Sequence, residues 1–166
     1  MWYRGHITPI WNEDYKKLNY VKRPAQYEDI ERWRKEGYTH ENFTGVMYNN
    51  HNDMPDWVHE VADTIGLENC GFTFYKMSTG DIMPQHVDHF KKYCEIFNLE
   101  RDQVWRAVVA LEDWTNGHYF DIENQAICNY VKGDYILWSA DTEHSAANIG
   151  TKPRYTLQIT GTLKKI

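Results

Sequence analysis

The feature that most constrains the fold is a series of short strand-like segments that fills the second half of the chain. Segments of alternating apolar and polar residues are separated by turn sequences such as Asn116-Gly117 and Lys132-Gly133-Asp134. We predict strands over residues 72–77, 104–111, 118–122, 126–131, 135–138, 144–148 and 154–160. Strands of this number and spacing are typical of a β-sandwich or barrel.

Two helices are predicted before this region. Residues 24–36 suit a helix because Pro24 occupies a first-turn position, apolar residues recur at helical spacing and Gly37 follows as a stop. A second helix can be capped near Asp53 and Asp56 and ends at Gly66. Its apolar face consists of Trp57, Val58, Val61, Ala62 and Ile65. Each helix therefore has one apolar face to bury.

The last predicted strand indicates how these parts fit together. Its polar positions are Arg154, Thr156, Gln158 and Thr160, and the apolar Tyr155, Leu157 and Ile159 alternate with them. A polar face inside a barrel leaves the apolar face outside, where the helices can cover it. We therefore expect an α+β fold, a double-stranded β-helix (jelly roll) with N-terminal helices packed on the major sheet. The 166 residues predict one domain, in which 1–71 support a jelly-roll core at 72–161.

Composition excludes several classes of protein. With 42% hydrophobic and 25% charged residues the chain is an ordinary globule, and no apolar run is long enough to span a membrane. The first residues lack the pattern of a secretory signal, so we expect a cytoplasmic protein. Three cysteines, Cys70, Cys94 and Cys128, are scattered without metal-site spacing and are predicted to be free and mostly buried thiols.

The charge balance bears on partners. The net charge is −6, and neither half of the chain is cationic, so we expect no nucleic-acid partner. We also expect no membrane partner. Oligomeric state is not readable from the sequence, although exposed strand edges make a dimer conceivable.

The strongest chemical signal is a set of three metal-ligand residues. In extended chain His86 and Asp88 project to the same side, about 6.6 Å apart along the backbone. His144 lies 56 positions after Asp88, in another predicted strand. Two imidazoles and one carboxylate on one face of an octahedral ion leave three positions open, as in non-haem Fe(II) oxygenases. His89 is an alternative to His86 as the ligand.

A cationic residue follows at a suggestive place. Arg154 lies ten residues beyond His144, on the polar face of the last predicted strand. A guanidinium there suits a dicarboxylate that chelates a metal with one end and pairs with arginine through the other.

Together His86-x-Asp88, His144 and Arg154 resemble the 2-oxoglutarate- and Fe(II)-dependent dioxygenases, in particular the prolyl 4-hydroxylase-like branch. The resemblance covers residues 72–161, about half of the chain. It implies that the three ligands hold Fe(II) and that Arg154 binds the 5-carboxylate of 2-oxoglutarate. O2 would be the second co-substrate, and ascorbate is a candidate accessory reductant.

Further site residues are implied by the same resemblance. Tyr75, eleven residues before His86, falls where these hydroxylases often place a tyrosine facing the co-substrate, and Thr156 would share the carboxylate with Arg154. The chain departs from the pattern at Ala110, where many relatives place a second tyrosine. That departure puts one co-substrate contact in doubt.

The resemblance also implies a type of reaction. Halogenating relatives replace the carboxylate ligand, so Asp88 favours hydroxylation. Nucleic-acid demethylases of the superfamily carry a second arginine where this chain has Thr160. The expected activity is hydroxylation of a C–H bond, with a prolyl residue in a peptide or protein as substrate. The alternatives are a free amino-acid hydroxylase, a jelly-roll isomerase, and a non-catalytic cupin-like metal or small-molecule binding module.

Other residues have two interpretations each. His118 either faces the pocket or is a hydrogen-bonded edge histidine. The stretch 90–98 is either a solvated loop or a lid over the site. Aromatic residues that could line the cavity or belong to the core are Tyr119, Tyr130, Tyr135 and Trp138. The histidines expected at the surface are His6, His40, His51 and His59.

Overall fold

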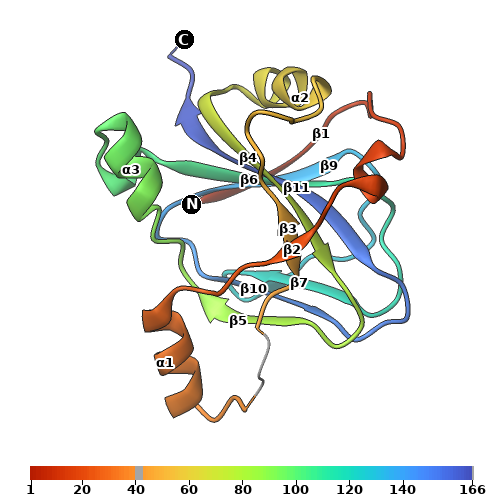
Figure 1. Ribbon diagram of the computed structural model, residues 1–166, viewed down its shortest axis with the longest axis vertical. Helices are drawn as coiled ribbons and strands as arrows, with labels where there is room; N and C mark the ends of the chain where they lie inside the picture. The colour runs from red at the N-terminus through yellow and green to blue at the C-terminus, as the bar shows by residue number, and fades with distance from the viewer. Residues whose placement is uncertain (40–42, 166) are drawn as a thin grey trace.

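The chain folds into two antiparallel β-sheets that face each other (Figure 1). The computed structural model describes residues 1–39 and 43–165. The larger sheet has the strand order β1-β9-β6-β11-β4-β3-β2, and the smaller has the order β5-β10-β7-β8. The strands are β1 (Trp2–His6), β2 (Val21–Lys22), β3 (Val46–Tyr48), β4 (Leu67–Met77), β5 (Ile82–His86), β6 (Trp105–Ala110), β7 (His118–Ile122), β8 (Gln125–Ala126), β9 (Asp134–Ser139), β10 (His144–Asn148) and β11 (Arg154–Leu163).

Helices lie outside the two sheets. They are α1 (Tyr27–Lys35), α2 (Trp57–Ile65) and α3 (Lys91–Phe97), with single 3₁₀ turns at Asp14–Lys17 and Arg101–Gln103. The end of α2 follows from its sequence, because Gly66 adopts the left-handed conformation (φ 90°) that closes the helix. Among the described residues, no helix is both long and apolar enough to cross a membrane.

The predicted fold class is confirmed: the molecule is an α+β double-stranded β-helix. β7 and β10 have the predicted bounds, and β4, β6, β9 and β11 agree within a few residues. The prediction of a strand over 126–131 is wrong except at Ala126, the second residue of β8. Asn129 there takes a left-handed backbone (φ 54°), which breaks an extended strand. The sequence analysis also missed β1, β2, β3 and β5.

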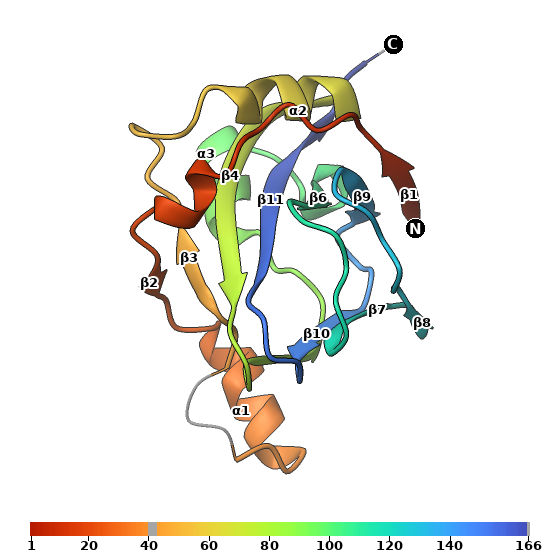
Figure 2. The ribbon, with the colours of Figure 1, turned by 90° about the vertical axis from the view of Figure 1, so that its right-hand side faces the viewer.

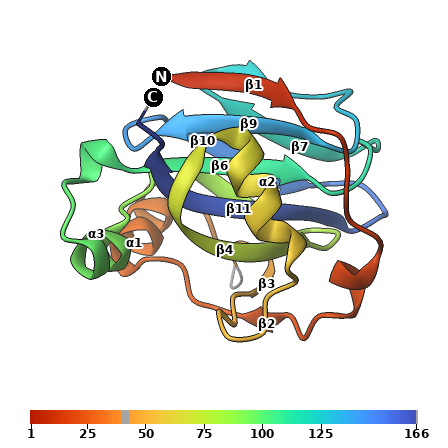
Figure 3. The ribbon, with the colours of Figure 1, turned by 90° about the horizontal axis from the view of Figure 1, so that it is seen from above.

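The two faces of β11 behave as their alternation predicts. Tyr155, Leu157 and Ile159 are buried in one cluster with residues of α2, including Val58 and Val61. Seen from above, α2 runs across this outer face of the larger sheet (Figure 3). The polar residues of β11 point between the sheets, so the interior is hydrophilic along this strand.

The first helix takes a different place from the one predicted. α1 lies at the opposite end of the molecule from α2 and does not cover the larger sheet (Figure 2). Its Trp33 is fully buried and donates a hydrogen bond from Nε1 to the backbone oxygen of Gln85 (3.2 Å). The ring of Trp33 also stands edge-on to His86, with centroids 5.9 Å apart. α1 therefore supports the end of β5, where the candidate metal ligands begin.

The cysteines are free, as predicted, but they are not mostly buried. Cys70 and Cys94 are half-buried and Cys128 is exposed. Cys128 lies in the stretch that was wrongly predicted as a strand.

Candidate metal centre and cavity

Three predicted ligands meet at one point between the sheets. His86 is the last residue of β5 and lies opposite His144, the first residue of β10, while Asp88 follows two residues after the strand. The ligand atoms of the three residues lie within 4.8 Å of one another. Nε2 of His86 is 3.9 Å from Oδ1 of Asp88, and Nε2 of His144 is 3.7 Å from Oδ2. All three side chains are buried.

Backbone hydrogen bonds orient both imidazoles. Nδ1 of His86 lies 2.8 Å from the carbonyl oxygen of Pro84, and Nδ1 of His144 lies 3.0 Å from that of Thr142. A carbonyl only accepts, so each Nδ1 carries the hydrogen and each Nε2 keeps its lone pair toward Asp88. Burial and the neighbouring His144 lower the pKa of His86 to about 4. The His86 ring is therefore neutral at physiological pH, which metal binding requires.

Two side chains hold the carboxylate ligand from outside. Arg106 of β6 donates to Oδ1 of Asp88 (3.1 Å), and Nε1 of Trp138 donates to Oδ2 (3.1 Å). Burial alone would raise the pKa of Asp88, but Arg106 and the two histidines outweigh it and lower the pKa to about 2. Sequence reasoning missed Arg106. The available signal was an arginine inside a strand that is otherwise apolar from residue 107 to 110.

The metal centre borders a cavity of about 740 Å³. Arg154, Tyr75 and Thr156, the residues assigned to the co-substrate, border the same cavity. The side chain of Arg154 is buried, with its Nε donating to the hydroxyl of Tyr130 (3.2 Å). In the part of the chain that the structure describes, no carboxylate pairs with Arg154. A buried cation without a counter-ion is costly, so the cavity offers an anion a strong electrostatic gain.

Tyr75 adds a second unpartnered group. It lies opposite Thr156 in the β4–β11 ladder, and its hydroxyl is buried without a hydrogen-bond partner in the described residues. Burial raises the pKa of Tyr75, against opposing effects of Thr44, Gly45 and Arg106, so the hydroxyl stays protonated and can donate. A buried donor without an acceptor points to a ligand or water in this cavity.

The donor set can therefore be tested against the groups that the resemblance implies. Two neutral imidazoles and a carboxylate suit a divalent transition metal with open positions. The unneutralised Arg154 and the free hydroxyl of Tyr75 suit an anionic, oxygen-rich ligand in the same cavity. Both groups fit the residues present.

The other histidines of the described residues lie outside the three-residue cluster. His89 is not part of the three-residue cluster; its Nε2 lies 3.2 Å from Oδ2 of Asp29, on α1. His118 is buried away from the cavity, with Nε2 2.8 Å from the carbonyl of Lys152, and burial lowers its pKa. His6, His51 and His59 are exposed, as predicted, whereas His40 lies outside the described residues.

The aromatic residues that were predicted either to line the cavity or to belong to the core differ in burial. Trp138 and Tyr130 are buried and contact site residues, Tyr119 is exposed, and Tyr135 is half-buried. The stretch 90–98 is mostly helical, because α3 occupies residues 91–97, and this helix borders the cavity.

Comparison with known proteins supports the fold. A prolyl-4-hydroxylase from Pseudomonas putida superposes with a TM-score of 0.61 at 14% identity, over 99% of this chain and 93% of that chain. Two further structures are less similar. The plu4264 protein of Photorhabdus luminescens has a TM-score of 0.47 at 10% identity, over 87% of this chain and 88% of that chain. A cupin protein of Bacteroides fragilis has a TM-score of 0.42 at 15% identity, over 63% of this chain and 75% of that chain. No family model and no curated protein matches the sequence. The similarity therefore establishes the double-stranded β-helix fold and no more.

Proposed function

We propose that this protein is a 2-oxoglutarate- and Fe(II)-dependent dioxygenase that hydroxylates a C–H bond, with a prolyl residue in a peptide or protein as the expected substrate. In the overall reaction the substrate, O2 and 2-oxoglutarate give the hydroxylated product, succinate and CO2. The observation that carries the proposal is the pairing of two features in one cavity: a buried His-Asp-His cluster and a buried arginine without a counter-ion. A metal-binding cupin would have no need of the arginine.

Each residue has a separate task in this proposal. His86, Asp88 and His144 would hold Fe(II), which, with the co-substrate, supplies the oxidising power when bound. Arg154 would pair with the 5-carboxylate of 2-oxoglutarate, and Thr156 and Tyr75 would donate hydrogen bonds to the same molecule. Arg106 and Trp138 fix the rotamer of Asp88 by occupying one lone pair on each carboxylate oxygen.

The size of the cavity bears on the substrate. About 740 Å³ lies within the range of sites that enclose drug-sized ligands, which is more than a five-carbon diacid occupies. The remaining space reaches residues of α1 and α3, among them Trp33, Tyr93 and Phe97. An aromatic, partly apolar approach favours a peptide segment over a free amino acid.

The direct test is turnover. Purified protein with Fe(II), 2-oxoglutarate and O2 should release succinate, and Asp88→Ala should abolish this release. A wild-type protein that binds Fe(II) yet neither binds 2-oxoglutarate nor forms succinate would refute the dioxygenase proposal and leave a metal-binding module.

The substrate is identified by mass. Proline-containing peptides and free amino acids should be incubated separately with the complete mixture and examined for the gain of one oxygen atom. The proposal expects the gain in peptides. A gain in free amino acids alone would place the protein among the amino-acid hydroxylases instead.

A further inference from the structure

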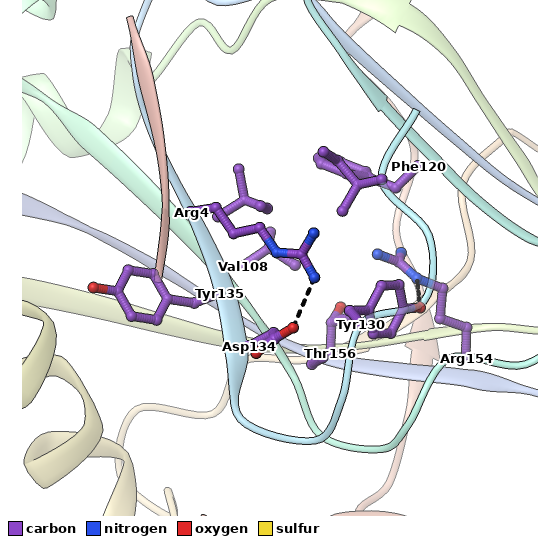
Figure 4. A pocket seen from close by; sticks show the side chains of 11 residues that line it. Arg4, Val108, Phe120, Tyr130, Asp134, Tyr135, Arg154 and Thr156 are labelled. Carbon is purple, nitrogen blue, oxygen red and sulfur yellow. Dashed lines mark hydrogen bonds and ion pairs between the residues drawn. The ribbon is translucent and has the colours of Figure 1, made fainter. Parts of the chain in front are cut away.

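A small pocket lies beside Arg154 (Figure 4). None of the three candidate metal ligands borders it. It has a volume of about 20 Å³, room for about one water molecule. Arg154, Thr156, Val108 and Phe120 border both this pocket and the large cavity. The small pocket therefore adjoins the cavity in front of the metal ligands. Tyr130 closes part of the small pocket and points its hydroxyl at Arg154 (Figure 4).

The direction of the hydrogen bond between the two residues is fixed by chemistry. Nε of arginine can only donate, so the hydroxyl oxygen of Tyr130 accepts (3.2 Å). The hydroxyl hydrogen must then point elsewhere. Tyr130 is 8% exposed, and its hydroxyl donates to no acceptor among the described residues. A buried donor is thus presented next to the guanidinium.

The other donors at this place are also free. The terminal nitrogens of Arg154 reach no oxygen in the described parts of the chain. Nη1 lies 4.0 Å from Met77 Sδ, and the guanidinium lies over the ring of Phe120, 5.6 Å from its centroid. The hydroxyl of Thr156, two residues along β11, makes no hydrogen bond within residues 1–39 and 43–165. Guanidinium, tyrosine hydroxyl and threonine hydroxyl therefore converge without an acceptor.

Arg4, the other cationic residue that borders the small pocket, is not free to bind an anion. Arg4 of β1 donates to Oδ2 of Asp134 (2.9 Å), so its charge is already compensated. Ala110 borders the pocket with only a methyl group. Tyr130, from the segment between β8 and β9, packs in the same cluster as Ala110 and supplies the hydroxyl that β6 lacks.

We infer that Tyr130 is a direct ligand for the far carboxylate of the co-substrate. Arg154 orients the tyrosine by donating to its oxygen, and the tyrosine donates its hydrogen to the carboxylate beside the guanidinium. This inference rests on the proposed function, since it assigns a residue to the 2-oxoglutarate site. The tyrosine that binds the far carboxylate would then lie between β8 and β9. It would not lie at position 110 of β6, where the resemblance implies a tyrosine and this chain has Ala110.

The test is calorimetric titration of Mn(II)-loaded protein, in which the proposed function expects the co-substrate to bind without turnover. Wild type, Tyr130→Phe and the control Tyr135→Phe are each titrated with 2-oxoglutarate and with 2-oxopentanoate, which has the same carbon chain but no far carboxylate. Tyr135 of β9 packs against the cluster on the outer face of the larger sheet and makes no hydrogen bond to Arg154, so its variant measures the general effect of a Tyr→Phe change next to the site.

Tyr130→Phe should weaken 2-oxoglutarate binding about tenfold, as expected for a hydrogen bond to a charged group, and should leave 2-oxopentanoate within about twofold. Tyr135→Phe should change neither. Unchanged 2-oxoglutarate affinity in Tyr130→Phe, or an equal loss for both keto acids, overturns the inference while the proposed function stands. If wild type itself binds no 2-oxoglutarate, the proposed function fails, and the assignment of Tyr130 fails with it.

Discussion

The two ends of the cavity are built in opposite ways. At the metal end hydrogen bonds hold all three ligands: Arg106 and Trp138 donate to Asp88, and backbone carbonyls accept from His86 and His144. At the Arg154 end the terminal guanidinium nitrogens and the hydroxyl of Tyr130 donate to no oxygen among the described residues. The first end is a rigid, preorganised set of ligands, whereas the second is an unneutralised charge that a bound anion would complete. The difference separates a site for a metal from a site for a carboxylate, and each prediction below tests it.

The largest effect is expected at the metal end. Asp88→Asn removes the one anionic ligand and leaves Arg106 without its counter-ion, so affinity for Co(II) or Mn(II) should fall more than about 100-fold. Metal titration of the purified variant measures this. Asp141→Asn, at an exposed carboxylate, serves as control. Equal metal affinity in Asp88→Asn and wild type would show that the cluster is not the metal site.

The second-largest effect is expected at the Arg154 end of the cavity. Arg154→Met removes the guanidinium and should weaken 2-oxoglutarate binding about 100-fold, since a bidentate charged pair is lost, with metal affinity nearly unchanged. Arg4→Met, which breaks the neighbouring but compensated ion pair, should leave both affinities near those of wild type. A parallel loss of metal and 2-oxoglutarate affinity in Arg154→Met would mean that the two ends are not separate.

The buried histidine predicts a pH dependence in the metal-free protein. The pKa of His86 is lowered from 6.5 to about 4 in the folded state. Between these pH values the unfolded chain binds a proton that the folded protein does not, so stability falls as pH falls, by up to about 3 kcal/mol at pH 4. Asp88, lowered from 3.8 to about 2, extends the loss to lower pH.

Urea unfolding of metal-free protein from pH 7 to 4 measures this slope. His86→Gln should flatten it relative to wild type, whereas His59→Gln, at an exposed position, should not. A wild-type slope equal to that of His86→Gln would show that the ring is charged in the folded protein.

The smallest predicted effect concerns the support of Asp88. Trp138→Phe removes the donor to Oδ2 and should weaken metal binding about tenfold, leaving the contribution of Arg154 to 2-oxoglutarate binding intact. Trp114→Phe, which loses a bond to the His118 carbonyl instead, is the matched control. If both variants lose metal affinity equally, the effect is one of packing rather than of orientation.

Much of this arrangement could be predicted from the sequence because it depends on local periodicity. The alternation along β11 correctly placed Arg154 and Thr156 inside and Leu157 outside, and the spacing of His86 and Asp88 anticipated their convergence. Period-two patterns carry this information because one face of the strand is buried and the other lines a cavity.

Other features depend on contacts between distant segments and left little trace in the sequence. Arg106 reaches Asp88 from β6, and Tyr130 reaches Arg154 from an irregular segment that was predicted to be a strand. The position of α1 was also wrong, because Trp33 fits an apolar helix face equally well whether that face covers the sheet or the end of β5. In each case tertiary packing decides between local patterns that look alike.

The central claim is that one ligand spans both ends of the cavity, and titration of 2-oxoglutarate into metal-free and Mn(II)-loaded wild-type protein tests it most directly. The account predicts saturable binding that is at least about tenfold tighter with the metal present, because the metal and Arg154 then hold the same molecule. Absence of binding to the metal-loaded protein, or the same affinity with and without metal, would contradict it.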